Sequence, residues 1–74
     1  MEEISKLVDI GKQNLENGKF EVALSFFEQA LIINPLDPDL WNLKGTALRS
    51  IGRYDEAIES FNKSLEIEPR NKHS

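Results

Sequence analysis

The chain has 74 residues, enough for one small domain that buries about 60% of its unfolded surface. Its hydrophobic content of 39% supports a core, and its net charge of −4 argues against nucleic acid, whose phosphates need a basic surface. The absence of cysteine excludes disulfides and thiolate zinc sites and favours the cytoplasm over secretion. No stretch has the apolar run of a signal peptide or the roughly 20 apolar residues that span a membrane. We therefore expect a cytoplasmic protein with no membrane or nucleic-acid partner.

Apolar residues in the first half of the chain recur at spacings of three and four, which predicts two helices. We expect the first over about residues 3–16 and the second over about residues 20–33. Gly18 ends the first, because glycine readily adopts the left-handed conformation that caps a helix. The second ends before Pro35, because the residue ahead of a proline avoids the helical region. The predicted apolar stripes are Ile4, Leu7, Val8, Gly11 and Leu15, and then Phe20, Ala23, Leu24, Phe27, Ala30 and Leu31.

Two further helices follow, over about residues 38–51 and about residues 54–67. Asp37 is the expected N-cap of the third helix, and Pro38 is its first residue. Gly52 separates the third helix from the fourth. The predicted stripes are Leu40, Trp41, Ala47, Leu48 and Ile51, and then Tyr54, Ala57, Ile58, Phe61 and Leu65. No sustained alternation of apolar and polar residues predicts a strand.

The second half of the chain repeats the first at an offset of 34 residues. The identical pairs are Gly11 and Gly45, Gly18 and Gly52, Ala23 and Ala57, Phe27 and Phe61, Leu31 and Leu65, Ile33 and Ile67, and Pro35 and Pro69. Short loops between the helices predict antiparallel neighbours. A glycine inside a helix costs about 1 kcal/mol relative to alanine, so each mid-helix glycine predicts a contact too close for a methyl group. The natural partners are Ala23 and Ala57, with Phe27 and Phe61 one turn further on.

This pattern resembles the tetratricopeptide repeat, whose unit carries W…L-G…Y on its first helix and A…F…A…P on its second. The second copy supplies Trp41, Gly45, Tyr54, Ala57, Phe61, Leu65 and Pro69, and the first supplies Leu7, Gly11, Phe20, Ala23, Phe27, Ala30 and Pro35. The departures are Asn14, Lys44 and Ser64; we expect Lys44 to extend its ammonium to solvent while Leu43 shares its packing role.

The resemblance covers about residues 4–71 and defines one domain, residues 1–74. It divides this domain into a first repeat at about 4–37, a second at about 38–71 and a polar tail at 72–74. The implied fold is all-α, with two antiparallel helix-turn-helix repeats stacked as a short right-handed α-solenoid. The implied function is that of a non-catalytic scaffold for protein–protein interaction.

In this family the first helix of each repeat lines a concave groove that binds a peptide or a partner helix. The positions that the resemblance places on that groove are Ser5, Val8, Asp9, Lys12, Glu16, Asp39, Asn42, Leu43, Thr46, Arg49 and Ser50. Lys12, Asn42 and Arg49 are donors able to hold a peptide carboxylate or carbonyl. The alternative is that all of these are ordinary solvated residues of helix surfaces.

One branch of the family grips the C-terminal carboxylates of chaperone tails with lysines, asparagines and an arginine. The matching positions here include Val8, Lys12 and Leu43, so most of the required polar side chains are missing. The third repeat used by that clamp is also absent. We therefore do not predict binding of chaperone tails.

No motif predicts catalysis, a cofactor or a metal ion. The one histidine, His73, lies in the polar tail, and a metal site needs several ligands. Carboxylates such as Glu66 and Glu68 are two residues apart on a helix and point to different sides, whereas general acid–base catalysis needs a converging pair. Trp41 is expected to be a packing residue, although an exposed tryptophan would be able to stack on a ligand. We therefore expect that the protein is not an enzyme.

Two repeats are few for an array of this kind, in which each unit buries its apolar face against a neighbour. The fourth helix would have nothing to cover Ile58, Leu65 and Ile67. Its outer side is more polar than that of the second helix, because Glu56, Ser60 and Glu66 replace Val22, Phe26 and Ile32. Either this outer side acts as a cap, or Val22, Phe26 and Ile32 form an apolar patch for a partner or a second copy. A third possibility is that Phe26 and Ile33 pack on the third helix. The alternative function is thus a self-associating module, or a piece of a longer repeat protein that pairs with another chain.

Overall fold

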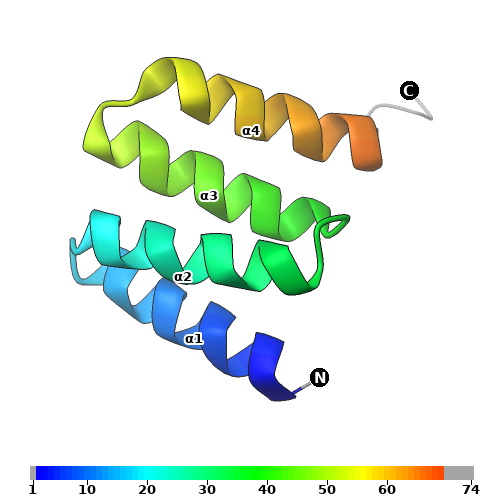
Figure 1. Ribbon diagram of the computed structural model, residues 1–74. Helices are drawn as coiled ribbons and strands as arrows, with labels where there is room; N and C mark the ends of the chain where they lie inside the picture. Colours follow the sequence, from blue (N-terminus) through cyan, green and yellow to red (C-terminus); the bar gives the residue numbers. More distant parts are fainter. Residues whose placement is uncertain (1, 70–74) are drawn as a thin grey trace.

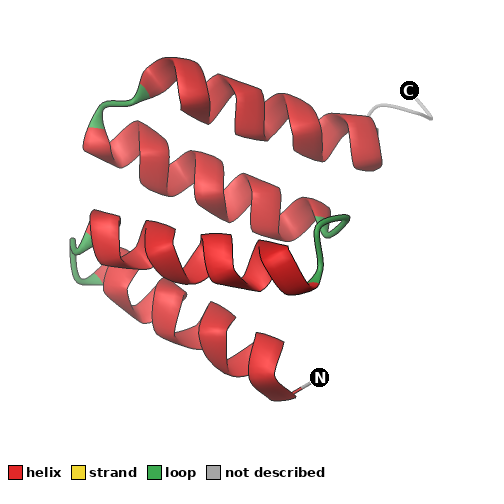
Figure 2. Cartoon of the chain, viewed as in Figure 1, coloured by secondary structure: helices red, strands yellow, loops and turns green. Residues whose placement is uncertain are grey.

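The computed structural model describes residues 2–69, so the predicted polar tail and His73 lie outside the described residues. Within this range the chain forms four α-helices joined by short loops (Figures 1 and 2). The bounds are α1 (Glu2–Glu16), α2 (Phe20–Ile33), α3 (Pro38–Ile51) and α4 (Tyr54–Ile67). The predicted helices are confirmed, and the bounds of the last three agree with the prediction to the residue.

Two glycines end the first helix of each repeat. Gly18 has φ +82° and Gly52 has φ +103°, the left-handed region that glycine adopts without a steric penalty. The Gly52 amide donates to the carbonyls of Leu48 and Arg49 at 3.0 and 3.1 Å, and the Arg53 amide donates to Leu48 at 2.9 Å. These bonds satisfy carbonyls at the helix end that have no partner within the helix.

The loop between the repeats starts α3 as predicted. Asp37 accepts a hydrogen bond on its side chain from the Asp39 amide at 3.0 Å, with Pro38 at the first helical position. The Trp41 indole Nε1 donates to the Pro35 carbonyl at 2.8 Å, which ties the loop to α3. Trp41 is half-buried and packs against the core, so its predicted packing role is confirmed.

Each helix packs against the next, and the four lie in chain order across the molecule (Figure 1). The architecture is an all-α solenoid of two antiparallel helix pairs. Two clusters of buried side chains form the core, and α2 contributes to both. One consists of Ala23, Leu24, Phe27, Ala47, Leu48 and Ala57, and the other of Ala30, Leu31 and Leu40. Helix α2 is therefore covered by α1 on one side and by α3 on another.

The mid-helix glycines make the close contacts predicted, but with different partners. A Cβ atom built on Gly11 would lie 2.6 Å from Cε1 of Phe27, and one built on Gly45 would lie 2.7 Å from Cε1 of Phe61. The nearest side chains are therefore the phenylalanine rings, not Ala23 and Ala57 as the sequence suggested. A ring reaches further across the helix interface than a methyl group, so it defines the distance of closest approach.

The second repeat buries two serines, Ser60 at 3% exposure and Ser64 at 1%. The expectation that Ser60 lies on the polar outer side of the fourth helix is therefore wrong. The Ser64 hydroxyl has no hydrogen-bond partner among the described residues, and the equivalent residue of the first repeat is Ala30, which is fully buried. A buried hydroxyl without a partner costs about 1–3 kcal/mol.

Ser64→Ala is expected to raise the free energy of unfolding by about 1 kcal/mol, because it removes this hydroxyl and also favours the helix. Urea unfolding followed by circular dichroism measures the change. The matched control is Ser25→Ala, since Ser25 is exposed on α2 and its hydroxyl accepts a hydrogen bond from Gln29. A lower stability in Ser64→Ala would show that the hydroxyl contributes a bond to the fold.

Candidate functional site

The predicted groove residues on α1 lie along one exposed side of that helix. Asp9, Lys12 and Glu16 are all exposed, and their spacings of three and four place them on a single face. Val8 adjoins this face but is half-buried, because it packs against the cluster that contains Leu31. The predicted α1 side of the groove therefore has a charged surface with an apolar edge.

The predicted residues on α3 form a second such face. Asn42, Thr46 and Arg49 lie three or four residues apart, with Asn42 and Thr46 half-buried and Arg49 exposed. Leu43 is half-buried and packs against both core clusters. Val8 of α1 and Leu43 of α3 therefore pack against the same cluster, which contains Ala30, Leu31 and Leu40.

Donor groups are available on these two faces. The side chains of Lys12 and Asn42 make no hydrogen bond or ion pair in the part of the chain that the structure describes. The Thr46 hydroxyl donates to the Asn42 main-chain carbonyl at 3.0 Å, so it is not available to donate a hydrogen bond to a ligand. The Arg49 guanidinium lies 5.9 Å from the centre of the Phe61 ring, within the range of a cation–π interaction. That contact leaves its N–H groups free to donate.

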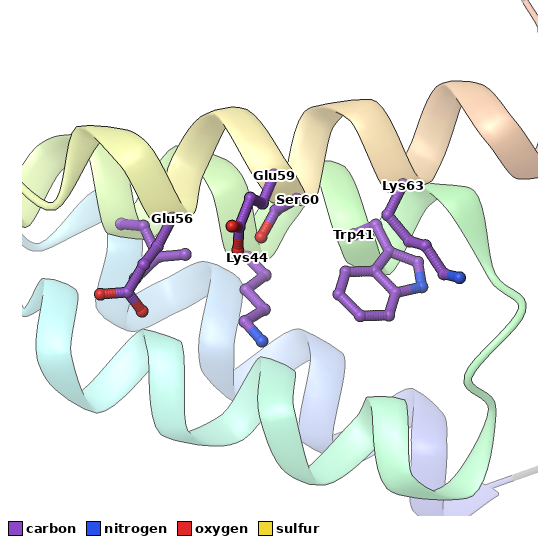
Figure 3. Close-up of a pocket in the computed structure, with 7 residues that line it drawn as sticks. Trp41, Lys44, Glu56, Glu59, Ser60 and Lys63 are labelled. Carbon is purple, nitrogen blue, oxygen red and sulfur yellow. The ribbon is translucent and has the colours of Figure 1, made fainter.

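A hollow of about 250 Å³ opens on a different side of the molecule, between α3 and α4 (Figure 3). Sequence reasoning missed it, and none of the predicted groove residues lines it. The signal was the replacement of Phe26 in the first repeat by Ser60 in the second, since a serine leaves space that a phenylalanine ring would fill, together with the polar Lys44 in place of Ile10. Its lining consists of Trp41, Lys44, Leu48, Glu56, Glu59, Ser60 and Lys63.

Lys44 crosses this hollow toward α2 (Figure 3). Its Nζ lies 5.2 Å from the centre of the Trp41 ring and 3.8 Å from a carboxylate oxygen of Glu28. Lys44 was expected to extend its ammonium to solvent; its side chain is instead only 24% exposed and its ammonium turns toward α2, whereas Leu43 packs against the core as expected. The ion pair between Lys44, which lines the hollow, and Glu28 of α2 links the two repeats.

A second ion pair begins α4. Arg53 donates to Glu56 through Nε at 2.9 Å and through Nη2 at 2.6 Å. This hydrogen bonding and the attraction between the charges raise the pKa of Arg53 and lower the pKa of Glu56. Glu56 occupies the position of Val22 in the first repeat, so the substitution exchanges an exposed apolar side chain for half of a surface ion pair. Such a pair adds little to stability because water solvates both groups.

The residues predicted to take part in self-association do not form one surface. Val22, Ile32, Ile58 and Leu65 are exposed, whereas Phe26 and Ile67 are half-buried. Val22 and Phe26 are four residues apart on one face of α2, but Ile32 lies on another. Ile33 is 48% exposed, so its burial gives no support to the alternative in which Phe26 and Ile33 pack on the third helix. Self-association itself stays a prediction.

Residues 2–69 contain neither a group of metal ligands nor a helix that could span a membrane. No three or more His, Cys, Asp or Glu side chains gather there in a way that would hold a metal ion. No helix in this range has the length and apolar character needed to cross a membrane.

Known proteins share the repeat pattern. The family profile described as tetratricopeptide repeat matches residues 38–71, the second and more regular copy. An uncharacterized protein of Methanocaldococcus jannaschii is 40% identical over 68 residues, covering 92% of this chain and 74% of that protein. The Hsp70-Hsp90 organising protein of Plasmodium falciparum is 38% identical over 66 residues, covering 89% of this chain.

The lengths of these relatives differ. The chain spans 26% of that organising protein and 12% of the same-named protein from Plasmodium falciparum isolate 3D7. The peroxisomal targeting signal receptor of Saccharomyces cerevisiae is 36% identical over 50 residues, covering 68% of this chain and 8% of the receptor. The chain belongs to the tetratricopeptide repeat family.

Proposed function

We propose that this protein binds a peptide or a helix of another protein on the face formed by α1 and α3. Membership of the family identifies it as a protein–protein interaction module. The observation that carries the finer proposal is the set of available donors on the two helices, Lys12, Asn42 and Arg49, beside the half-buried Val8 and Leu43. Such a surface suits an extended segment with a carboxylate or free carbonyls and a small apolar side chain.

The names of two relatives support an interaction of this class. One denotes an organiser of Hsp70 and Hsp90, and the other denotes a receptor for a targeting signal. Neither ligand transfers to this chain by similarity, because it covers a small part of both relatives. Val8 and Leu43 also stand at positions where binding of chaperone tails requires polar side chains. The proposal therefore specifies the face and the chemistry of its donors, but no named partner.

Selection from a peptide library with free C-termini, displayed against the 74-residue protein, tests the proposal. Lys12→Ala together with Arg49→Ala is expected to weaken binding of the selected peptides by at least about tenfold, because each charged hydrogen bond contributes about 1.5–3 kcal/mol. Isothermal titration calorimetry measures the affinity, and circular dichroism checks that the helices persist.

The control is Lys6→Ala together with Lys63→Ala, which changes the net charge by the same amount. Lys6 is exposed on α1, and Lys63 lines the hollow between α3 and α4. We expect this variant to bind the selected peptides as the wild type does. Equal binding by the Lys12/Arg49 variant and the wild type would remove these residues from the site and refute the proposal.

A further inference from the structure

The outer side of α4 carries an exposed apolar stripe. Tyr54, Ile58 and Leu65 are spaced by four and seven residues, which places them on one face of the helix, and all three are exposed. We call these three residues the α4 seam. Helix α4 lies at the end of the stack in Figure 1 and packs chiefly against α3. The α4 seam therefore lacks a neighbouring helix within residues 2–69.

The internal repeat shows what kind of element covers such a face. The equivalents of Ile58 and Leu65 in the first repeat are Leu24 and Leu31. Leu24 and Leu31 are 6% and 7% exposed, whereas Ile58 and Leu65 are 55% and 46% exposed. The difference comes from α3. Its side chains cover the face of α2, with Ala47 and Leu48 in the cluster of Leu24 and Leu40 in the cluster of Leu31.

The charged residues beside the α4 seam indicate which charge a covering helix would carry. Asp55, Glu59 and Glu66 each follow a seam residue by one position, so they line the adjacent face, and all three are exposed. The α2–α3 interface gives an example, because Lys44 of α3, the helix that covers α2, pairs with Glu28 of α2 at 3.8 Å. A helix that covers α4 would meet these three acids, of which Glu66 also pairs with Lys63 of α4 at 3.8 Å.

We propose that the α4 seam binds an amphipathic helix of another protein, one with an apolar seam like that of α3 and a basic flank. The aliphatic side chains of the partner replace the contacts that α3 makes with α2. Its lysines or arginines face Asp55, Glu59 and Glu66. Charge complementarity of this kind orients the partner and selects it over neutral amphipathic helices.

A second copy of the chain does not fit this description. The α1 residues equivalent to Leu40, Ala47 and Ile51 are Lys6, Gln13 and Asn17, which are polar and exposed, so α1 cannot take the place of α3 on another copy. Two α4 helices in a two-fold antiparallel pair would bring the same flank of each together. The acids of both copies would then face one another, which is unfavourable.

A peptide derived from α3 provides the probe. It has the sequence of residues 37–52 with Trp41→Lys, which places a new lysine on the same helix flank as Lys44 and keeps the apolar residues Leu40, Ala47, Leu48 and Ile51. The matched peptide carries Trp41→Glu and Lys44→Glu. We expect the lysine peptide to bind at least about tenfold more tightly than the glutamate peptide, and its affinity to fall as salt is added.

Two protein variants locate the site. Ile58→Glu with Leu65→Glu is expected to weaken binding of the lysine peptide by at least about tenfold, because it buries charge in an apolar contact. Val22→Glu with Ile32→Glu introduces the same charges at exposed apolar positions of α2 and should leave binding unchanged. Lys12→Ala with Arg49→Ala should also leave it unchanged, which separates this surface from the one in the proposed function.

The proposal fails if the lysine peptide does not bind, or binds no better than the glutamate peptide. It also fails if the Ile58/Leu65 variant retains wild-type affinity. Sedimentation equilibrium tests whether a second copy of the chain binds the α4 seam instead. If the wild type is a dimer and the Ile58/Leu65 variant is a monomer, the seam is a dimer interface and the assignment to a basic helix of another protein is overturned. Because Ile58 and Leu65 are exposed, circular dichroism should show wild-type helicity in the variant.

Discussion

Phe27→Ala is expected to lower the free energy of unfolding by about 3–5 kcal/mol. The Phe27 side chain is fully buried, belongs to the main core cluster and touches α1 at Gly11. Removal of the ring leaves a cavity that α1, α2 and α3 cannot all close at once. The stability of small domains is about 5–15 kcal/mol, so this one substitution removes a large part of it. Urea unfolding monitored by circular dichroism at 222 nm measures the change.

Phe61→Ala is the matched control, because Phe61 holds the same position in the second repeat. Phe61 is only half-buried, since no helix within residues 2–69 covers the far side of α4. Its truncation is therefore expected to lower the free energy of unfolding by clearly less. If Phe27→Ala prevents folding altogether, Phe27→Leu and Phe61→Leu give the same comparison at lower cost. An equal or greater loss at Phe61 would contradict the unequal burial of the two rings.

The helices were predictable from the sequence because local chemistry determines where they begin and end. Asp37 and Pro38 start α3, Gly18 and Gly52 adopt the left-handed conformation, and the turn before Pro35 ends α2. These signals act within a few residues and do not depend on the rest of the fold. The offset of 34 residues then predicted how the two helix pairs are related.

Periodicity alone did not predict the difference between equivalent positions; the expectation that nothing covers Ile58 and Leu65 came from the number of repeats, and the exposure of both side chains agrees with it. Leu31 and Leu65 are the same residue at the same place in the repeat, yet one is buried and the other exposed. Periodicity identifies the apolar face of a helix but not the number of neighbours that cover it. For the same reason the sequence did not reveal that Ser60 is buried, or that the space beside it forms a hollow.

The candidate site was predictable only in part. The sequence identified the faces that carry Lys12 and Arg49, because helical spacing determines a face. The distribution of burial within those faces, with Val8 and Leu43 against the core, depends on contacts between α1, α2 and α3. The ligand depends on side-chain orientations and on the partner itself, which no spacing rule supplies.

Gly11→Ala is expected to destabilise the protein by about 2 kcal/mol, the difference between about 3 kcal/mol of overpacking and about 1 kcal/mol gained in helix propensity. The new Cβ would lie 2.6 Å from Phe27 Cε1, and the fully buried ring has no space into which it can turn. Gly45→Ala is the control: its Cβ would meet Phe61 at a similar 2.7 Å, but that ring is half-buried and can move outward. Urea unfolding of both variants compares the two costs.

A double-mutant cycle with Phe27→Leu tests the cause directly. Leucine lacks the ring edge that meets the new methyl group, so Gly11→Ala in the Phe27→Leu background should be neutral or stabilising. The coupling between the two sites is then about 2–3 kcal/mol, in the range found for residues in contact. Additive effects would show that Gly11→Ala acts through the backbone, and that the ring of Phe27 does not determine how closely α1 approaches α2.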